Sequence, residues 1–295
     1  MEDLSVRIKD LDFEYSLTNG THCVLRGLNM ELERGSRCLL VGANGSGKST
    51  ILRILAGKHL TKSENPEKSF VTVMGKDAFR DISLNMCRAH LDTQWGMRTM
   101  AFAGYGCPLQ SDIRVGDMMK KLQSEYSERR DTLVKLLGID LNWRMHLVSD
   151  GQRRRVQIFL SLIRPFDILL LDEVTTCLDV IVRHELLGWL KRESIVNKST
   201  IIYATHIFDG IDDWPTNIHY LKRGGITGWK GTLYDLYNTY DELPPILGIV
   251  LSWLRSEKDT DGCEKEEESG DIAITQKTYL SSDRGGGYNP GRMCS

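Results

Sequence analysis

The sequence lacks long apolar runs, a strong charge of either sign and a recognisable leader. No hydrophobic stretch approaches the ~20 residues needed to cross a bilayer as a helix, so no transmembrane helix is expected. With 38 basic and 40 acidic residues the formal net charge is −2, which gives no reason to expect general binding to nucleic acids or anionic membranes. Residues 1–4 lack the apolar core of a signal peptide, so we expect no secretory leader.

Cysteines are scattered: there are seven in 295 residues, and none forms a C-x-x-C pair. Cys38 and Cys177 lie inside apolar or motif segments, where reduced, buried cysteines are usual. This usage indicates a reducing compartment, the cytosol or the nucleus. Apolar residues make up 41% and charged residues 26%, as in ordinary globular proteins, and the length allows one large domain or two small ones.

One short stretch carries more information than any other. Residues 42–49 read Gly-Ala-Asn-Gly-Ser-Gly-Lys-Ser and match the phosphate-binding loop G-x-x-x-x-G-K-[ST]. Its glycines allow backbone angles closed to other residues, so successive N–H groups can turn toward an anion. Lys48 can reach the β- and γ-phosphates, and the Ser49 hydroxyl can bind Mg²⁺. We therefore expect a nucleoside triphosphate to be held by Gly42, Asn44, Gly45, Ser46, Gly47, Lys48, Ser49 and Thr50.

Strand and helix patterns alternate along the chain, which predicts an α/β layered sheet. The segment 6–15 alternates apolar and polar residues, as an edge strand or a strand pair does. The continuous apolar run 168–171 suits a parallel strand covered on both faces. Residues 96–163 are expected to be mostly helical. Further strands are expected at 24–33, 37–41, 200–204 and 218–221, and helices at 49–56 and 182–190.

The end of the chain differs in composition. Residues 255–271 contain few aliphatic side chains and include the run Glu-Lys-Glu-Glu-Glu, and three consecutive glycines follow at 285–287. Such a sequence cannot bury enough apolar surface to fold by itself. We expect a flexible acidic and glycine-rich tail over 255–295 and a nucleotide-binding unit over 1–254.

Two acids follow the apolar run at 168–171. At the carboxyl end of a buried strand beside a phosphate loop, Asp172 can hold Mg²⁺ through its water shell, and Glu173 can polarise an attacking water. The alternative is a strand that simply ends in solvated acids. Lys48 upstream favours the catalytic interpretation.

Three further segments and one aromatic residue occur in an order that a known family shares. Residues 147–157 read Leu-Val-Ser-Asp-Gly-Gln-Arg-Arg-Arg-Val-Gln, residues 173–179 read Glu-Val-Thr-Thr-Cys-Leu-Asp, and residues 204–206 read Ala-Thr-His. The first resembles the L-S-G-G-Q signature of ATP-binding-cassette (ABC) ATPases, the second their E-P-T-S-x-L-D segment, and the third their switch histidine. Tyr15 falls where the family's adenine-stacking aromatic belongs. The resemblance covers about residues 4–235.

The resemblance implies an α/β P-loop NTPase fold: an ABC cassette with an N-terminal antiparallel β subdomain and a helical signature subdomain at about 96–163. It implies ATP and Mg²⁺ as ligands, and head-to-tail pairing in which each ATP lies between one subunit's phosphate loop and the other's signature helix. His206 would hold the γ-phosphate and the attacking water, acting with Glu173 and Lys48. The residues that would reach the other subunit are Ser149, Gly151, Gln152 and Asp179.

Several positions depart from the family pattern. Asp150 stands where glycine is usual, and its carboxylate near the partner's γ-phosphate would weaken the closed dimer, although an acid in a first helical turn favours that helix. Val174 replaces the usual proline. Gln94 is the best candidate by position for the family's metal-binding and transmission glutamine, but the surrounding match is poor. We interpret the arginines at 153–155 as the solvated face of the signature helix rather than as a nucleic-acid contact.

The form of the signature is similar to that of small, single-cassette ABC proteins of plants and fungi without a membrane domain, among them a fungal factor associated with the transcription-regulating deadenylase complex. A first hypothesis is a free-standing ATPase that regulates a soluble partner, paired with itself or a related cassette. A second is the ATPase subunit of a membrane transporter whose pore is a separate chain, which would need a groove near residues 94–120. A third is a nucleotide-dependent scaffold; hydrolysis is favoured over it by Lys48, Asp172, Glu173 and His206.

Overall fold

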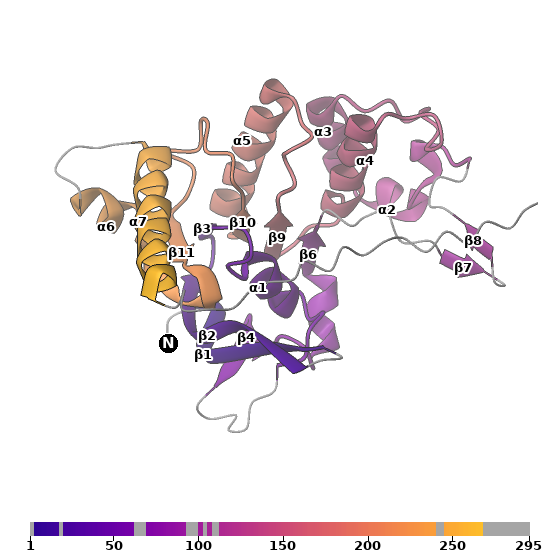
Figure 1. Ribbon diagram of the computed structural model, residues 1–295. Coiled ribbons are helices and arrows are strands. Elements are labelled where there is room, and N and C mark those ends of the chain that lie inside the picture. Colours follow the sequence, from indigo (N-terminus) through magenta and orange to yellow (C-terminus); the bar gives the residue numbers. More distant parts are fainter. Residues whose placement is uncertain are drawn as a thin grey trace, which may run out of the picture. The chain divides into compact units, whose positions relative to one another are not determined.

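Two β-sheets organise the chain, as the computed structural model in Figure 1 shows. The structure describes residues 3–17, 20–61, 69–92, 100–102, 105–107, 112–239 and 245–267. The contacts divide the chain into two units, residues 1–255 and residues 256–295. The fold and the site described below belong to the first of these units.

The smaller sheet is antiparallel and comes from the N-terminal part of the chain. β1 pairs with β2 on one side and with β4 on the other, and is therefore an interior strand. Of the two alternatives expected at 6–15, an edge strand or a strand pair, the edge strand was wrong, because alternation shows that one face is buried and not where the strand lies in the sheet. In the order β2-β1-β4-β5, the strands are β2 (Gly20–Glu33), β1 (Leu4–Leu17), β4 (Phe70–Val73) and β5 (Lys76–Asp77).

The larger sheet has six strands and is parallel except where β12 pairs antiparallel with β11. β10 lies between β3 and β9, so the strand that enters the phosphate loop and the strand that ends in the acid pair are both its neighbours. In sheet order, the strands are β12 (Thr227–Thr232), β11 (Asn217–Leu221), β3 (Arg37–Gly42), β10 (Thr200–Ala204), β9 (Ile168–Asp172) and β6 (Arg88–Leu91).

Both faces of the larger sheet are buried, in two separate hydrophobic clusters. Successive residues of β9 alternate between them: Ile168 and Leu170 belong to one cluster, and Leu169 and Leu171 to the other. The first cluster also contains the buried side chains of β1 and β2 and of helix α1 (Lys48–Leu55). This double burial is why residues 168–171 of β9 are all apolar, rather than apolar at every second position. The layered α/β architecture expected from the sequence is confirmed.

The helices on the other face of the sheet come mainly from residues 112–196. Within the region 96–163, which we expected to be mostly helical, β7 (Met100–Phe102) and β8 (Tyr105–Cys107) instead pair as antiparallel strands, in a segment whose aromatic residues favour strands. The helices here are η2 (Val115–Asp117), α2 (Lys120–Glu125), α3 (Ser127–Leu137), α4 (Asp150–Leu162) and α5 (Val180–Val196). The remaining helical segments are η1 (Ile82–Met86), η3 (Arg223–Gly225), α6 (Leu233–Asn238) and α7 (Ile246–Glu267).

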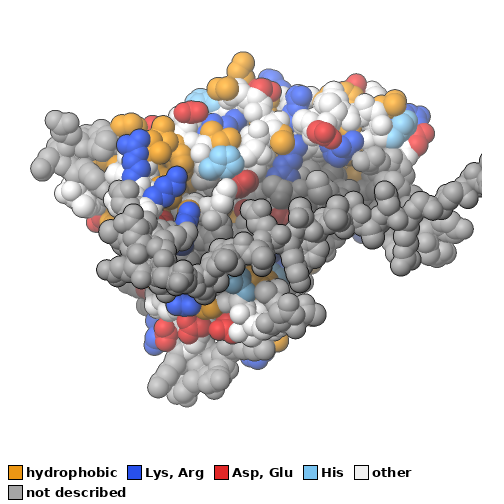
Figure 2. Space-filling view, viewed as in Figure 1, with side chains coloured by type: hydrophobic (Ala, Val, Ile, Leu, Met, Phe, Trp, Pro, Cys, Tyr) orange, Lys and Arg blue, Asp and Glu red, His pale blue; other side chains and the backbone are white. Residues whose placement is uncertain are grey.

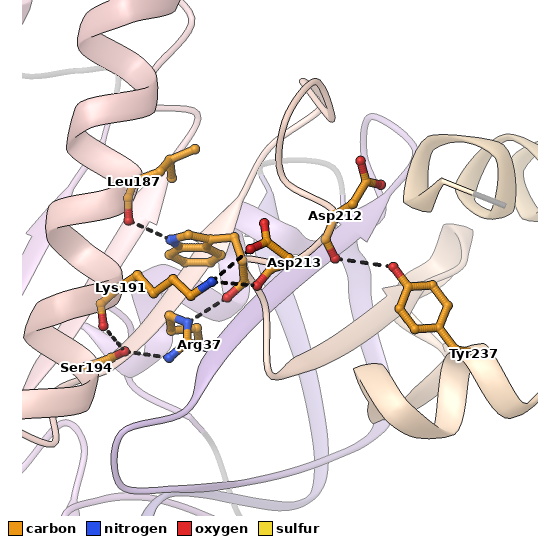
Figure 3. A network of polar contacts seen from close by, with 8 residues as sticks. Arg37, Leu187, Lys191, Ser194, Asp212, Asp213 and Tyr237 are labelled. Atoms are coloured by element: carbon orange, nitrogen blue, oxygen red, sulfur yellow. Dashed lines mark hydrogen bonds and ion pairs between the residues drawn. The ribbon is translucent and has the colours of Figure 1, made fainter. Parts of the chain in front are cut away.

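A polar network joins the start of β3 to α5, and its hydrogen bonds around Arg37 are buried (Figure 3). Arg37 donates from Nε to the carbonyl of Trp214 at 2.6 Å and from Nη1 to the hydroxyl of Ser194 at 2.7 Å. The indole of Trp214 in turn donates to the Leu187 carbonyl at 2.9 Å, and Lys191 is ion-paired with Asp213 at 3.0 Å. Because α5 begins just after the acid pair, this network helps to fix that helix against the strand that leads into the phosphate loop.

The helix α7 extends beyond the point where we expected a flexible tail. It continues to Glu267. The boundary between a nucleotide-binding unit over 1–254 and a tail over 255–295 stays a prediction. Within the first unit, the Trp253 ring stacks on Tyr220 at a centroid distance of 4.9 Å and on Trp229 at 5.7 Å. None of the helices in the described parts of the chain combines the length and the hydropathy required to cross a membrane. Figure 2 shows basic, acidic and hydrophobic side chains interspersed on one face.

Candidate nucleotide site

The phosphate loop lies between the end of β3 and the start of α1. Gly42 ends the strand with φ 154°, and a Cβ there would lie 2.4 Å from the Leu221 carbonyl oxygen. Gly47 immediately precedes the helix with φ 95°, and a Cβ there would lie 2.6 Å from a methyl group of Leu25. Gly42 is therefore required by the close approach of the neighbouring backbone as well as by its backbone angle, whereas at Gly47 the left-handed backbone angle itself favours glycine.

Two polar groups in this loop are suited to an anionic ligand. Lys48 donates from Nζ to the carbonyls of Gly42 and Ala43 at 2.8 and 2.9 Å, and its burial lowers the pKa of the ammonium against the opposing effect of Glu173 and Asp172. The hydroxyl of Ser46 is fully buried and has no hydrogen-bond partner among the described residues. A buried hydroxyl without a partner is costly, and a phosphate oxygen would provide one. These residues fit a triphosphate.

Asp172 and Ser49 form the oxygen pair expected to hold Mg²⁺. Burial raises the pKa of the Asp172 carboxyl, an effect that a hydrogen bond to the Ser49 side chain partly opposes. A carboxylate and a hydroxyl are hard oxygen ligands, and Mg²⁺ prefers these together with water and phosphate oxygens. The two side chains fit this cation, which when bound would neutralise charge on the phosphates.

Glu173 and His206 meet at the carboxyl ends of adjacent strands. Glu173 follows β9, and its backbone N–H donates to the carbonyl of Ala204, the last residue of β10, at 3.0 Å. Glu173 has φ 50°, a left-handed conformation that is strained for a residue with a side chain. Its Oε1 lies 3.4 Å from Nδ1 of His206. The strained backbone directs an acid toward an imidazole next to the phosphate loop.

The side chains of Ser149 and Gln152 cap the start of the signature helix α4. The Ser149 hydroxyl accepts a hydrogen bond from the backbone N–H of Gln152 at 3.3 Å, and the Gln152 side chain accepts one from the Ser149 N–H at 2.9 Å. This reciprocal capping box leaves Ser149 exposed at a helix end that favours anions. Asp179 caps α5 in a similar way, by accepting from Val182 N–H at 2.9 Å.

The carboxylate of Asp150 is paired with a nearby cation. It is 94% exposed and ion-paired with Arg153 one turn later in α4, and the Arg153 side chain is only 23% exposed. Arg153 also donates to the Val148 carbonyl at 3.4 Å, so the guanidinium is held against the start of the helix. The repulsion that we expected from Asp150 is therefore opposed by a neighbouring cation.

Our interpretation of the arginines at 153–155 as a solvated face is wrong for Arg154. It is buried, and it donates from Nε to the Val174 carbonyl at 3.2 Å and from Nη1 to the Asp92 carbonyl at 2.7 Å. The side chain of Gln157 also donates to the Asp92 carbonyl, at 3.0 Å. Sequence reasoning missed this link, because the adjacent arginines differ only in which side of the helix they occupy. α4 is thereby tied both to the residue after Glu173 and to the end of β6.

Tyr15 lies beside the phosphate-loop helix, and its role as the adenine-stacking aromatic stays a prediction. Its hydroxyl is 3.3 Å from Thr50 Oγ1 and 3.2 Å from His59 Nε2, and its ring meets those of Phe13 and His59 edge-on. His59 was not anticipated, and no sequence motif marks it. Gln94 lies outside the described residues.

Known proteins share both the sequence pattern and the fold. A family profile described as ABC transporter matches residues 25–176. ABC transporter I family member 20 of Arabidopsis thaliana is 40% identical over 98% of this chain and 87% of its own length. CCR4-associated factor 16 of Saccharomyces cerevisiae is 36% identical over 77% of this chain and 78% of its own. A solved dimeric bacterial ABC transporter cassette, 19% identical, matches with a TM-score of 0.61 over 77% of this chain and 98% of that one, which shows a common fold.

The buried acid allows a stability test. Because burial raises the pKa of Asp172, the folded protein keeps that proton to higher pH than the unfolded chain, and its stability falls as pH rises through this interval. Asp172→Asn should therefore increase the free energy of unfolding of the nucleotide-free protein at pH 7, by an amount on the order of 1 kcal/mol. The gain should disappear in acid, where the wild-type carboxyl is also neutral.

Urea unfolding at pH 7 and at acidic pH measures this difference. Asp209→Asn, which changes an exposed carboxylate, is the matched control and should alter stability by less than about 0.5 kcal/mol. A less stable Asp172→Asn protein at pH 7 would contradict the cost assigned to the buried carboxylate.

Proposed function

The chain belongs to the ATP-binding-cassette (ABC) family and is an ATPase, and from this premise we propose that it acts as a free-standing cassette whose ATP-driven pairing regulates a soluble partner complex in the cytoplasm. The observation that carries the proposal is that the expected site residues fall into two separate groups. Lys48, Glu173 and His206 converge at one edge of the sheet, whereas Ser149 caps a helix whose exposed start makes none of its hydrogen bonds with them. A second cassette would bring such a helix start to the triphosphate.

Each part of the phosphate-loop side then has a chemical role. The loop N–H groups, Ser46 and Lys48 bind the β- and γ-phosphates and orient them. Ser49 and Asp172 hold Mg²⁺, and Tyr15 stacks on the adenine. Further contacts in the same site come from Gly42, Asn44, Gly45, Gly47 and Thr50, with Gln94 as a third metal-side residue.

Hydrolysis would depend on the Glu173–His206 pair. The Glu173 carboxylate accepts a hydrogen bond from the attacking water and so polarises it, and His206 keeps that water and the γ-phosphate in line. The phosphoryl group passes to the water, which leaves ADP and phosphate. From the second copy, Ser149, Gly151 and Gln152 approach the γ-phosphate, and Asp179 contacts the opposite subunit and links the two sites.

The soluble partner is proposed from similarity. The yeast relative is named as a factor associated with CCR4, and the relatives match most of their length with a single cassette. A second candidate, the ATPase subunit of a membrane transporter, is favoured by one observation. A pocket of about 250 Å³ lies between β6, α2 and α4, and residues such as Ala89, Met119 and Leu160 line it, so that it offers a place for a helix of a separate membrane chain.

Replacing the proposed water-polarising residue should separate binding from turnover. We expect Glu173→Gln to bind ATP normally, to lose turnover by about 100-fold or more, and to accumulate as a dimer on sizing chromatography only with ATP and Mg²⁺. Lys48→Ala, which loses the phosphate contact, should bind ATP weakly and stay monomeric. Unchanged turnover in Glu173→Gln would remove that residue from the catalytic role.

The Asp150–Arg153 pair predicts a non-additive response. Arg153→Gln should lower kcat/KM for ATP by about 3- to 10-fold, because it leaves an uncompensated carboxylate facing the partner's phosphate. The double variant Asp150→Gly with Arg153→Gln should recover most of that loss, since both charges are then gone. Steady-state hydrolysis of the four proteins in the cycle measures this coupling, and strictly additive effects would show that the pair has no such role.

The nature of the partner can be tested with the full-length chain. Affinity purification of the tagged protein from its own cells, once without detergent and once from detergent extracts, should recover the same soluble proteins in stoichiometric amounts. Lys48→Ala serves as the control, because partners that depend on the ATP state should be reduced with it. A stoichiometric multi-span membrane protein in the detergent extract would contradict the free-standing assignment and support the transporter candidate.

A further inference from the structure

The backbone of Glu173 is held in its strained conformation by contacts on both sides. A φ of 50° costs free energy for a residue with a side chain, so surrounding contacts must fix it. The N–H of Glu173 donates to the Ala204 carbonyl at 3.0 Å, and the Glu173 carbonyl accepts from the Thr176 hydroxyl at 3.1 Å. The next carbonyl along the chain, that of Val174, accepts from Arg154 Nε at 3.2 Å. Of these partners, Arg154 belongs to the signature helix α4.

The guanidinium of Arg154 reaches Val174 in a fixed orientation. Its Nη1 donates to the Asp92 carbonyl at 2.7 Å and also to the side-chain oxygen of Gln157. Gln157 donates in turn to the same Asp92 carbonyl at 3.0 Å. The planar fork of Arg154 therefore binds two backbone carbonyls at once, one just after β6 and one just after β9.

Stability alone does not account for a guanidinium at this place. Arg154 is only 9% exposed, and its Nη2 is buried without a hydrogen-bond partner among the described residues. A buried cation with an unpaired donor costs folding free energy, and apolar side chains of similar volume are often as stable in such places or more so. A local cost without a local gain points to a functional role.

We propose that Arg154 is a positioning residue for hydrolysis, which keeps the Glu173 carboxylate directed at the attacking water by fixing the chain that follows it. The inference rests on the proposed role of Glu173. Without the bond to Val174, the segment would be free to relax toward an ordinary φ and to turn the carboxylate away from Nδ1 of His206, which lies 3.4 Å from it. A displacement of about 1 Å at a reacting group can cost about 100-fold in rate.

Arg154→Lys in the full-length protein tests this role. Lysine keeps the charge, but a single ammonium cannot bind both carbonyls in the geometry of the fork. We expect kcat for ATP hydrolysis to fall about tenfold, while the dissociation constant of a fluorescent ATP analogue stays within about twofold, because the phosphate-binding residues are unchanged.

A double variant separates positioning from a general structural defect. Glu173→Gln with Arg154→Lys should turn over no more slowly than Glu173→Gln alone, since the carboxylate that Arg154 directs is then absent. A structural defect would instead lower the rate by the same factor in both backgrounds.

The next residue of α4 supplies a matched control. Arg155 donates to the Leu137 carbonyl at 3.3 Å and lies over the Trp143 ring at 5.9 Å from its centroid. Arg155→Lys therefore makes the same change on the same helix while the Arg154 bond to Val174 stays in place, and it should keep kcat within about twofold.

A second variant leaves Arg154 in place. Gln157→Leu removes the side-chain oxygen that orients Nη1 and should lower kcat about threefold, again without slowing Glu173→Gln further. It carries the test if Arg154→Lys does not fold. Normal kcat in a folded Arg154→Lys protein, an equal loss in Arg155→Lys, or a further loss in the Glu173→Gln background would overturn the positioning role. Unchanged turnover in Glu173→Gln itself would instead contradict the proposed role of Glu173.

Discussion

The position of β10 between β3 and β9 is the constraint on which the site depends. These strands are parallel, so their carboxyl ends lie at one edge of the sheet, and each continues into a functional segment: the phosphate loop, His206 or the acid pair. The backbone bond from Glu173 to Ala204 fixes two of these segments directly against each other. An order that placed further strands between β3 and β9 would move the phosphate loop away from the acids even with every motif intact. The burial of both sheet faces holds this order in place.

Several groups at the site each carry a cost in folding free energy. The site contains a carboxyl with a raised pKa, a buried ammonium, a strained Glu173 and a Ser46 hydroxyl with no partner among the described residues. A triphosphate with a divalent cation would offer partners to the carboxyl, the ammonium and the hydroxyl, so these side chains are complementary to such a ligand. Other parts of the fold offset this cost in folding free energy. They include the two apolar clusters and the Arg37 network that ties α5 to β3.

The signature helix α4 has two distinct faces. Its start is exposed and capped by Ser149, whereas one turn later Arg154 is buried and binds the carbonyls of Val174 and Asp92. A contact made at the exposed start is therefore connected through one side chain to the residue that follows Glu173 and to the end of β6. In the proposed dimer, pairing and hydrolysis would share this element.

The sequence by itself determined the phosphate loop, the acid pair, the signature segment and the strands with clear periodicity. These features depend on residues close together in the chain, since a glycine turn, a helix cap or a buried strand requires certain residue types at certain local spacings. Only the tertiary structure decided that β1 is interior, that Asp150 is paired, that Arg154 is buried among three neighbouring arginines, and that His59 meets Tyr15. The partners in the last two cases lie tens of residues away, and which side chains meet over that distance follows from packing, which a local pattern does not encode.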